Sequence, residues 1–340
     1  MTITAEASKT IANGEISPVE RLHALVAADM TAADRMIHDR MGSAVALIPD
    51  LAKHLVDSGG KRLRPLLTLA SARACGYGGV HHIKLAAAVE FIHTATLLHD
   101  DVVDASTLRR GKLAANIVWG NKPSILVGDF LFSRAFELMV ETGNMNVLGV
   151  LARASSIIAE GEVMQLKSAN NLATTEEDYL CVVTAKTAAL FAASAESGAA
   201  VTGAPAAMVE AFRDYAHNLG IAFQLIDDTL DYSGRQAQMG KSVGDDFREA
   251  KVTLPVILAS ARADEEARIF WRRTIETGIQ HEGDLQRAII YVQDTGAIRE
   301  TRNRARRYAD MACDAIAKIP SPEIRDALMD VAEFCVGRGY

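Results

Sequence analysis

The chain has 340 residues, of which 49% are hydrophobic and 23% charged, so it can bury a large core and is neither intrinsically disordered nor fibrous. Its formal net charge of −7 disfavours non-specific binding to nucleic acid or to an anionic membrane, so a polyanionic ligand must meet a local basic cluster. Because only 6% of the residues are aromatic and alanine recurs throughout, the composition favours packed helices and predicts an all-α protein.

The N-terminal residues 1–16 contain no basic region followed by an apolar run, so they are expected to form a flexible tail and not a secretory signal. Residues 17–340 contain no low-complexity linker, fixed-period repeat or long charge run, which predicts a single domain.

The four cysteines are scattered without a CxxC pair, which favours a reducing cytoplasm over a disulfide framework or a zinc site. The apolar stretch 124–140 is interrupted by charged residues, so we expect a soluble protein without a membrane span.

Helical signals run through the rest of the chain. The sequence Ser17-Pro18-Val19-Glu20 has the pattern of a capping box with proline at the first helical position, and it predicts a first helix from residue 17. Apolar spacing then predicts long helices over 31–58, 64–76, 81–104, 123–142, 145–170, 175–201 and 205–232. Shorter helices are expected over 253–263, 265–278, 284–293, 295–318 and 321–336.

The helix predicted over 81–104 ends in three aspartates. At ~100° per residue, Asp100, Asp101 and Asp104 fall within roughly 100° of arc and share one face of the helix. Like charges at this spacing repel each other unless a cation lies among them, and their hard oxygen ligands suit Mg²⁺. A single cluster of this kind is more often an ordinary solvated helix end.

The same spacing recurs in the helix predicted over 205–232, at Asp227, Asp228 and Asp231. Two acidic faces on two apolar helices are hard to explain as decoration exposed to solvent. Because Mg²⁺ usually binds one or two carboxylates together with substrate phosphates, the pair of triads suggests a diphosphate held between them by several ions.

Basic residues accompany the triads. The segment 59–65, GGKRLRP, brings three positive charges beside two glycines whose backbone can approach an anion closely, and Arg109 and Arg110 follow the first triad. Taken alone, these segments would be an exposed basic turn and a helix exit, and Lys186, Lys241 and Lys251 would be solvated lysines. Beside two acidic triads, the basic residues favour a diphosphate site.

The whole set of motifs resembles the trans-prenyltransferases, specifically the long-chain all-trans polyprenyl diphosphate synthases that make quinone side chains in bacteria. The resemblance spans nearly the whole chain, and the motifs come in the usual order of that family. They are GGKRLRP, EFIHTATLLHDDVVD, LRRGKLAAN, VGDFLFSRAF, EGEVMQL, KTAALF, FQLIDDTLDY and GKSVGDD.

This resemblance implies a fold, substrates and residue roles. The implied fold is a single helical bundle around a deep central cavity, the isoprenoid synthase fold, usually assembled as a homodimer in the cytoplasm. The six aspartates are implied to bind three Mg²⁺ and an allylic diphosphate. Isopentenyl diphosphate is implied to be bound by Lys61, Arg64, His93 and Arg110. The allylic diphosphate is implied to be bound by Arg109, Lys186 and Lys241, with Lys251 near one of the two groups. The developing carbocation is implied to be stabilised by the dipoles of the Lys186 carbonyl, the Thr187 hydroxyl and Gln224.

Two positions depart from the pattern of this family, and one predicted site residue allows another interpretation. Ala250 stands where the family commonly has glycine before the lysine, which leaves the position of Lys251 uncertain, and Ala105 stands where an acidic residue is common. Without the resemblance, His93 would be read as a hydrogen-bonded core histidine.

Product length is expected to depend on the helix that carries Asp100. Ala95, five residues earlier, and Thr96 are small, and with Ile92 they are expected to line an open tunnel. Phe132 and Phe136 are candidates for the tunnel floor, although aromatics at this spacing more often pack in a core. The resemblance implies a C40–C50 product built on a farnesyl or geranyl diphosphate primer.

Four alternatives stay open at this point: a shorter-chain synthase, a class I terpene cyclase, a non-catalytic regulatory subunit and a helical binding protein with surface aspartates. A cyclase would not need the GGKRLRP site, and regulatory subunits usually lack one triad, whereas this chain has both. No nucleic-acid partner is expected, and contact with a membrane should at most be peripheral, for product release.

Overall fold

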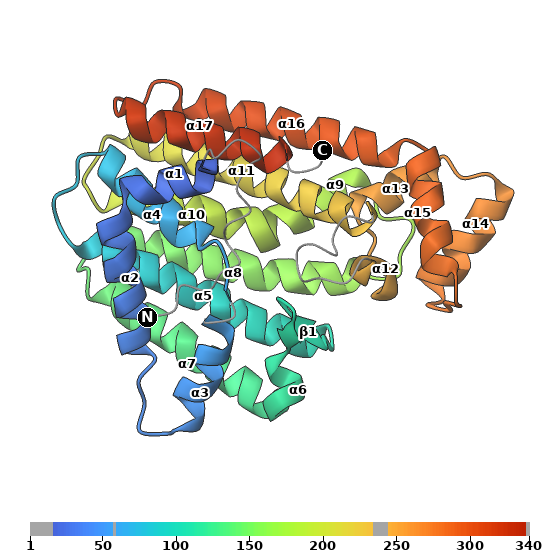
Figure 1. The fold of residues 1–340 in the computed structure, drawn as a ribbon, viewed down its shortest axis with the longest axis horizontal. Coiled ribbons are helices and arrows are strands. Elements are labelled where there is room, and N and C mark those ends of the chain that lie inside the picture. Colours follow the sequence, from blue (N-terminus) through green and yellow to red (C-terminus); the bar gives the residue numbers. More distant parts are fainter. Residues whose placement is uncertain (1–15, 57–58, 234–243, 338–340) are drawn as a thin grey trace.

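The computed structural model describes residues 16–56, 59–233 and 244–337, and this part of the chain is almost entirely helical (Figure 1). The expected N-terminal tail lies outside the described residues, apart from Ile16. In chain order the helices are α1 (Pro18–Leu25), α2 (Ala27–Arg40), α3 (Leu47–Val56), α4 (Leu63–Ala74), α5 (His81–Val103), α6 (Ala115–Trp119), α7 (Asn121–Val140), α8 (Met145–Ser168), α9 (Glu176–Val183), the π-helical turn η1 (Thr184–Ala188), α10 (Ala189–Ala200), α11 (Ala206–Asp231), α12 (Asp245–Arg248), α13 (Leu254–Ala261), α14 (Glu265–Trp271), the π-helical turn η3 (Arg272–Glu276), α15 (Asp284–Asp294), α16 (Ala297–Ile316) and α17 (Pro322–Gly337). One antiparallel hairpin, β1 (Leu108–Arg109) with β2 (Lys112–Leu113), lies between α5 and α6.

Most of the predicted helices are present within a few residues of their expected ends. The capping box at the start of α1 is formed, since the Glu20 amide donates to Ser17 Oγ at 3.2 Å and Glu20 Oε2 accepts from the Ser17 amide at 2.8 Å. The prediction of one helix over 31–58 is wrong, because the chain leaves the helix after Arg40 and re-enters it at Leu47. Gly42 and the serine after it lie in that break, where a helix loses propensity. The hairpin, α6 and α12 were not predicted, because each is too short to show a periodic pattern.

Helices α10 and α11 form the centre of the bundle and carry parts of the motifs KTAALF and FQLIDDTLDY. In Figure 1, α10 and α11 run between α16 and α17 on one side and α5, α7 and α8 on the other. Helix α10 is built almost wholly of small residues and is buried on nearly all sides. At Gly198, a Cβ would collide with the backbone oxygen of Thr68 in α4, so this close helix packing requires glycine.

The two aspartate triads come from different hydrophobic clusters. Helix α5 is buried in a cluster with α7 and α8, whereas α11 is buried with α4, α16 and α17. Because α10 contributes residues to both clusters, it fixes the two triad-bearing helices relative to each other.

A third hydrophobic cluster lies at the C-terminal side of α11 and includes α13, α14 and α15, which Figure 1 shows at one end of the molecule. Phe247 is anchored there by stacking on Phe270, with ring centroids 6.3 Å apart. This anchor fixes the segment 244–251 that follows the second triad, so the outer cluster positions part of the candidate site.

A partly buried ion pair next to this outer cluster gives a stability prediction. Arg273 donates two 2.8 Å hydrogen bonds to the Asp284 carboxylate, and the guanidinium holds the pKa of Asp284 at about 2, below its ordinary value of 3.8. A depressed folded-state pKa means that the stabilisation is full above about pH 4 and is lost as the pH falls through 2. Since the Arg273 side chain is partly exposed to screening solvent, Asp284→Asn is expected to lower the free energy of unfolding at pH 7 by only about 1–2 kcal/mol.

Urea unfolding of both proteins at several pH values measures this effect. The difference should shrink between pH 4 and pH 2, and the exposed Asp294→Asn variant should show no such difference. A loss of stability in Asp284→Asn that is independent of pH would contradict the assignment.

Within the described residues, Glu176–Ala200 is the one stretch long and apolar enough to cross a membrane, with a mean hydropathy of 1.2. This stretch was not predicted from the sequence as a candidate span. Of its most apolar window, 56% is buried inside the bundle, as expected of a core helix, so length and composition here are weak evidence for a span.

Candidate active site

The first triad is held by the hairpin that follows it. Asp101 is buried, and its Oδ1 accepts hydrogen bonds from the Arg109 guanidinium, including one from Nε at 2.8 Å. The Asn116 amide group donates to the backbone oxygen of Asp101 at 2.9 Å, which fastens the end of α5 to α6. The second carboxylate oxygen of Asp101 is buried without a hydrogen-bond partner. The triad is therefore only partly satisfied by protein groups.

Asp100 and Asp104 of the same triad have different surroundings. Burial raises the pKa of Asp100 to about 7, and nearby Lys186 opposes that rise while Glu162 and Asp104 add to it. Asp104 accepts a hydrogen bond from Lys251 Nζ at 3.0 Å. Burial disfavours the ionised form of Asp100, and a bound cation would stabilise that form.

The second triad is held by side chains and by backbone amides. Both oxygens of Asp228 are occupied, one by the Tyr179 hydroxyl and the other by Gln224 Nε2 at 2.8 Å. Burial raises the pKa of Asp228 to about 7 against the lowering effect of these two hydrogen bonds. Asp231 accepts from the backbone N–H groups of Gly244, Asp245 and Asp246 at 3.0–3.2 Å.

Lys251 links the two triads. It donates a hydrogen bond to Asp104, at the end of α5. Burial, together with the negative charges of Asp228 and Asp231 on α11, raises the pKa of Asp246 well above its usual range, and the charge of Lys251 opposes this rise. The two triads therefore face a shared region, as predicted. Asp246 extends the acidic group and was not predicted, although it stands in the GKSVGDD motif.

Ala250 adopts a left-handed backbone conformation, with φ at +51°, and its side chain is buried. A Cβ in this region costs roughly 1–2 kcal/mol, whereas glycine costs roughly 0.5–1 kcal/mol in backbone entropy. Ala250→Gly is therefore expected to leave the free energy of unfolding unchanged or to raise it by up to about 1 kcal/mol, as measured by urea unfolding. The matched variant Ala259→Gly, inside α13, should lower it by about 1 kcal/mol. A clear loss of stability in Ala250→Gly would show that packing outweighs strain there.

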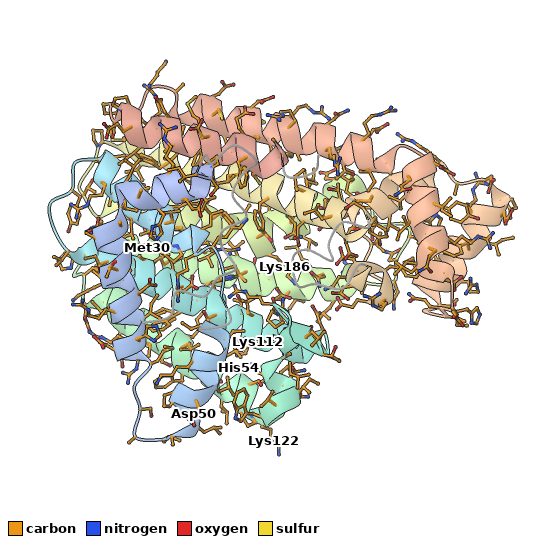
Figure 2. All side chains as sticks on the ribbon, viewed as in Figure 1. Met30, Asp50, His54, Lys112, Lys122 and Lys186 are labelled. Atoms are coloured by element: carbon orange, nitrogen blue, oxygen red, sulfur yellow. The ribbon has the colours of Figure 1, made fainter. Side chains whose placement is uncertain are left out.

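The π-helical turn η1 presents the predicted residues Lys186 and Thr187. Lys186 Nζ donates to Glu162 and to Gln165 of α8, both at 2.7 Å, and Figure 2 shows this lysine near the middle of the bundle. The Thr187 hydroxyl donates to Gln224 Oε1 at 3.0 Å. π-Helical turns within α-helices are frequent at functional sites. Here the turn joins the surroundings of the first triad to the second.

Three of the predicted isopentenyl diphosphate residues lie close together: Arg64, His93 of α5, and Arg110. Arg64 lies 3.3 Å from His93 Nε2, and its guanidinium packs over the Phe191 ring at 4.4 Å. Burial, together with the positive charges of Arg64, Arg110 and Arg109, holds the pKa of His93 well below its usual range. Neutral His93 can therefore donate or accept a hydrogen bond beside a cluster of fixed positive charge.

Glycine is required where this cluster meets the GGKRLRP turn. Gly60 has a φ of +145°, and a Cβ there would lie 2.9 Å from the Arg110 guanidinium, which donates to the Gly59 carbonyl. Burial lowers the pKa of Arg64 to about 10, and its Nε is buried without a partner. Lys61 lies on the exposed side of the turn, with its ammonium 5.9 Å from the Phe334 ring. Arg64 thus keeps one unsatisfied buried donor next to the turn, as a site for an anion would.

The residues around the triads fit divalent cations. The described residues contain no group of three or more His, Cys, Asp or Glu side chains already arranged to hold an ion. Arg109, Lys251 and Tyr179 instead hold the carboxylates. Because Mg²⁺ usually takes only one or two carboxylates with substrate phosphates, and because Asp101 keeps an unpaired buried oxygen, the donor set suits ions that bind together with a diphosphate.

Comparison with known proteins identifies the family. A family model described as polyprenyl synthetase matches residues 45–292. The chain belongs to the polyprenyl synthetase family. It is 43% identical over 320 residues to the octaprenyl diphosphate synthase of Escherichia coli (strain K12), covering 94% of this chain and 99% of that protein. This polyprenyl synthetase is therefore a prenyltransferase, as predicted, and the family acts on isoprenoid diphosphates.

Solved structures agree with this family and fold. The polyprenyl synthase of Caulobacter crescentus CB15, complexed with calcium and isoprenyl diphosphate, is 54% identical, with a TM-score of 0.92 over 95% of this chain and 98% of that chain. A decaprenyl diphosphate synthase from Rhodobacter capsulatus is also 54% identical, with a TM-score of 0.91 over 95% of this chain and all of that one. The predicted all-α isoprenoid synthase fold is confirmed.

The candidate chain-length residues of this polyprenyl synthetase lie in different surroundings. Ile92 and Ala95 are buried in the cluster shared by α5, α7 and α8, and Thr96 is partly buried. Phe132 packs at the edge of that cluster, where its ring stacks with that of His99. The prediction of Phe136 as part of an internal floor is not supported, because its side chain is 42% exposed on the outer side of α7.

One predicted site residue of this polyprenyl synthetase lies outside the described part of the chain, and two further residues that contact the site were not predicted. Lys241 lies outside the described residues, so its role stays a prediction. Tyr179 and Glu162 were not predicted, although both contact predicted site residues. Glu162 could have been found in the EGEVMQL motif, whereas no local signal distinguishes Tyr179 from a core tyrosine.

Proposed function

We propose that this polyprenyl synthetase is a long-chain all-trans polyprenyl diphosphate synthase that adds isopentenyl diphosphate units, one after another and with Mg²⁺, to a farnesyl or geranyl diphosphate primer. The observation that carries this proposal is the link between two aspartate triads through Lys251, next to a separate basic cluster at Arg64 and His93. Two anionic sites side by side suit a reaction that joins two diphosphate substrates.

The protein's own side chains bind and orient the two substrates. Arg64, Arg110 and Lys61 would grip isopentenyl diphosphate, since arginine forks match phosphate oxygens, and neutral His93 would complete that site. Lys186, Arg109 and Lys241 would contact the allylic diphosphate, with Lys251 alongside. Each diphosphate thus has its own set of cations, which keeps the two substrates in a fixed mutual orientation.

The aspartates differ in how firmly protein groups hold them. Asp228 and Asp231 accept hydrogen bonds on both carboxylate oxygens, so they are the most firmly oriented, whereas Asp101 keeps one buried oxygen without a partner. We propose that the six carboxylates together hold three ions per site. When bound, Mg²⁺ neutralises charge on the departing diphosphate.

Directed dipoles support the cation side of the reaction. As the allylic C–O bond breaks, the double bond of isopentenyl diphosphate attacks the allylic carbon, and the proton lost from the product goes to the released diphosphate. The Thr187 hydroxyl and Gln224 amide, joined by a 3.0 Å hydrogen bond, would orient their oxygens toward this positive charge. A further positively charged side chain there would destabilise the carbocation by repulsion.

A long product is supported by the small residues along α5. Ala95 is buried, and farther from Asp100 the same helix carries Ala88 on the same face and in the same cluster. At ~1.5 Å per residue, Ala88 lies about 10 Å beyond Ala95. The octaprenyl and decaprenyl synthases reported above support a C40–C50 product for quinone side chains.

A homodimer is supported by the exposed apolar surface of α7 and α8. Large hydrophobic side chains are exposed along both helices: Leu126, Val140, Met145, Val163 and Leu166. Exposed apolar side chains on two neighbouring helices suit an interface, and a second copy of the chain would cover them. We further propose a cytoplasmic enzyme with at most peripheral membrane contact.

The proposal is tested by incubating the purified protein with Mg²⁺, farnesyl diphosphate and labelled isopentenyl diphosphate, and by measuring the mass of the dephosphorylated products. We expect a ladder that ends in one long all-trans species. A ladder that stops at three or four units would indicate a shorter-chain synthase, and a cyclic hydrocarbon without label would indicate a terpene cyclase. No conversion with any allylic primer would indicate a regulatory or binding role.

A further inference from the structure

Tyr179 connects helix α9 to the second aspartate triad. Its side chain is buried, with 6% exposed, and its hydroxyl donates a hydrogen bond to Asp228 of α11. Helix α9 is itself fixed at its start, because Arg304 of α16 donates to both carboxylate oxygens of Glu176, with Nη2 at 2.9 Å from Oε2. The hydroxyl of Tyr179 therefore comes from a rigid support.

The bond to Tyr179 completes a chain of hydrogen bonds across the site. Thr187 donates to Gln224 at 3.0 Å, Gln224 donates to one oxygen of Asp228 at 2.8 Å, and Tyr179 donates to the other oxygen. With both oxygens held by donors from different helices, the Asp228 carboxylate has one orientation. Each additional donor to a buried carboxylate also removes a desolvation cost that would otherwise loosen it.

The orientation of Asp228 affects its neighbours because all three aspartates lie in the last two turns of α11. Asp227 precedes Asp228 directly, and Asp231 follows at three residues, so a turn of α11 that is pinned at Asp228 fixes where the other two carboxylates point. Without the Tyr179 hydroxyl, buried Asp228 keeps one donor and still faces the negative charges of Asp231 and Asp246.

We propose that Tyr179 is a positioning residue of the reaction, which holds the last turns of α11 so that Asp227 and Asp231 face the diphosphate and its divalent cations. It touches neither substrate nor ion and acts through Asp228. This inference rests on the proposed function, because it assigns Tyr179 to the binding of the allylic diphosphate.

The test uses the full-length chain with Tyr179→Phe, which removes one hydroxyl and keeps the ring. Tyr215→Phe is a matched control, since Tyr215 of α11 is also buried and donates to the Leu328 carbonyl at 2.7 Å, away from the triads. Calorimetric titration of inorganic diphosphate in the presence of Mg²⁺ measures binding without turnover. We expect Tyr179→Phe to bind diphosphate about tenfold more weakly than the wild type, and Tyr215→Phe to bind it equally well.

Steady-state kinetics provide a second readout. The KM for the allylic diphosphate should rise in Tyr179→Phe, whereas the KM for isopentenyl diphosphate should stay within about twofold, because that site lies at Arg64 and His93. Equal diphosphate affinity in Tyr179→Phe and the wild type would overturn the inference and leave the proposed function intact. A similar loss in both variants would overturn it too, since it would indicate a general effect of removing a buried hydroxyl. A wild-type protein that binds no diphosphate with Mg²⁺ would overturn the proposed function and the inference together.

Discussion

Replacement of Asp100 by alanine is expected to lower the rate of isopentenyl diphosphate incorporation by about a thousandfold or more. Asp100 lies in the acidic group between Lys186 and Asp104, and burial raises its pKa to about 7, so it is a carboxyl that a bound cation would convert to a strong ligand. Removing preorganised charge that acts on a departing anion costs about two to three orders of magnitude for a single group, and a lost metal ligand costs more. The measurement is the initial rate at saturating substrates and Mg²⁺.

The stability of the same variant distinguishes lost chemistry from lost structure. The folded-state pKa of Asp100 lies above its ordinary value of 3.8, so the ionised carboxyl destabilises the fold as the pH rises from about 4 through 7. Asp100→Ala should therefore unfold at the same urea concentration as the wild type at pH 7.5, or at a higher one. Asp50→Ala, on the exposed outer surface of α3 (Figure 2), should change neither the rate nor the stability. A near-normal rate in Asp100→Ala would exclude the proposed role.

The features that the sequence predicted are those that depend on spacing within one helix. Asp100, Asp101 and Asp104 share a face because α5 runs to Val103 and Asp104 is its C-cap residue, and the second triad lies within α11. Spacing also shows why both helices are buried, since the residues before each triad are almost uninterrupted apolar ones. The break between α2 and α3 was missed because the apolar spacing continues across Gly42, although the chain does not stay helical there.

The partners that satisfy the triads could not be predicted, because they come from elements distant in the sequence. Tyr179 reaches Asp228 from α9, and Lys251 reaches Asp104 from the segment after the second triad. No local pattern records such contacts. The motif order nevertheless placed Lys251 near the site despite the alanine before it, and the left-handed conformation of Ala250 explains why glycine would suit that position.

Ala95→Phe is expected to replace the long product by a short one of about three or four isoprene units. Ala95 is fully buried in the cluster formed by α5, α7 and α8, five residues before Asp100, so a ring there would lie about 7.5 Å along the helix from the first triad. Growth of the hydrocarbon chain would then meet the ring early, while ionisation of the primer at the triads would be unaffected. The products are identified by their masses after dephosphorylation.

The matched variant Ala88→Phe tests whether product length depends on the position of the added ring along α5. Ala88 lies seven residues before Ala95, which puts it on the same face of α5 and about 10 Å farther from the triads, in the same buried cluster. Its product should be longer than that of Ala95→Phe and shorter than that of the wild type. Because an added ring in a packed core costs about 1–3 kcal/mol, both variants should lose similar stability, so a difference in product length cannot come from unfolding. Equal product lengths in the two variants would mean that the chain does not grow along this face of α5, and an unchanged length in Ala95→Phe would exclude the tunnel altogether.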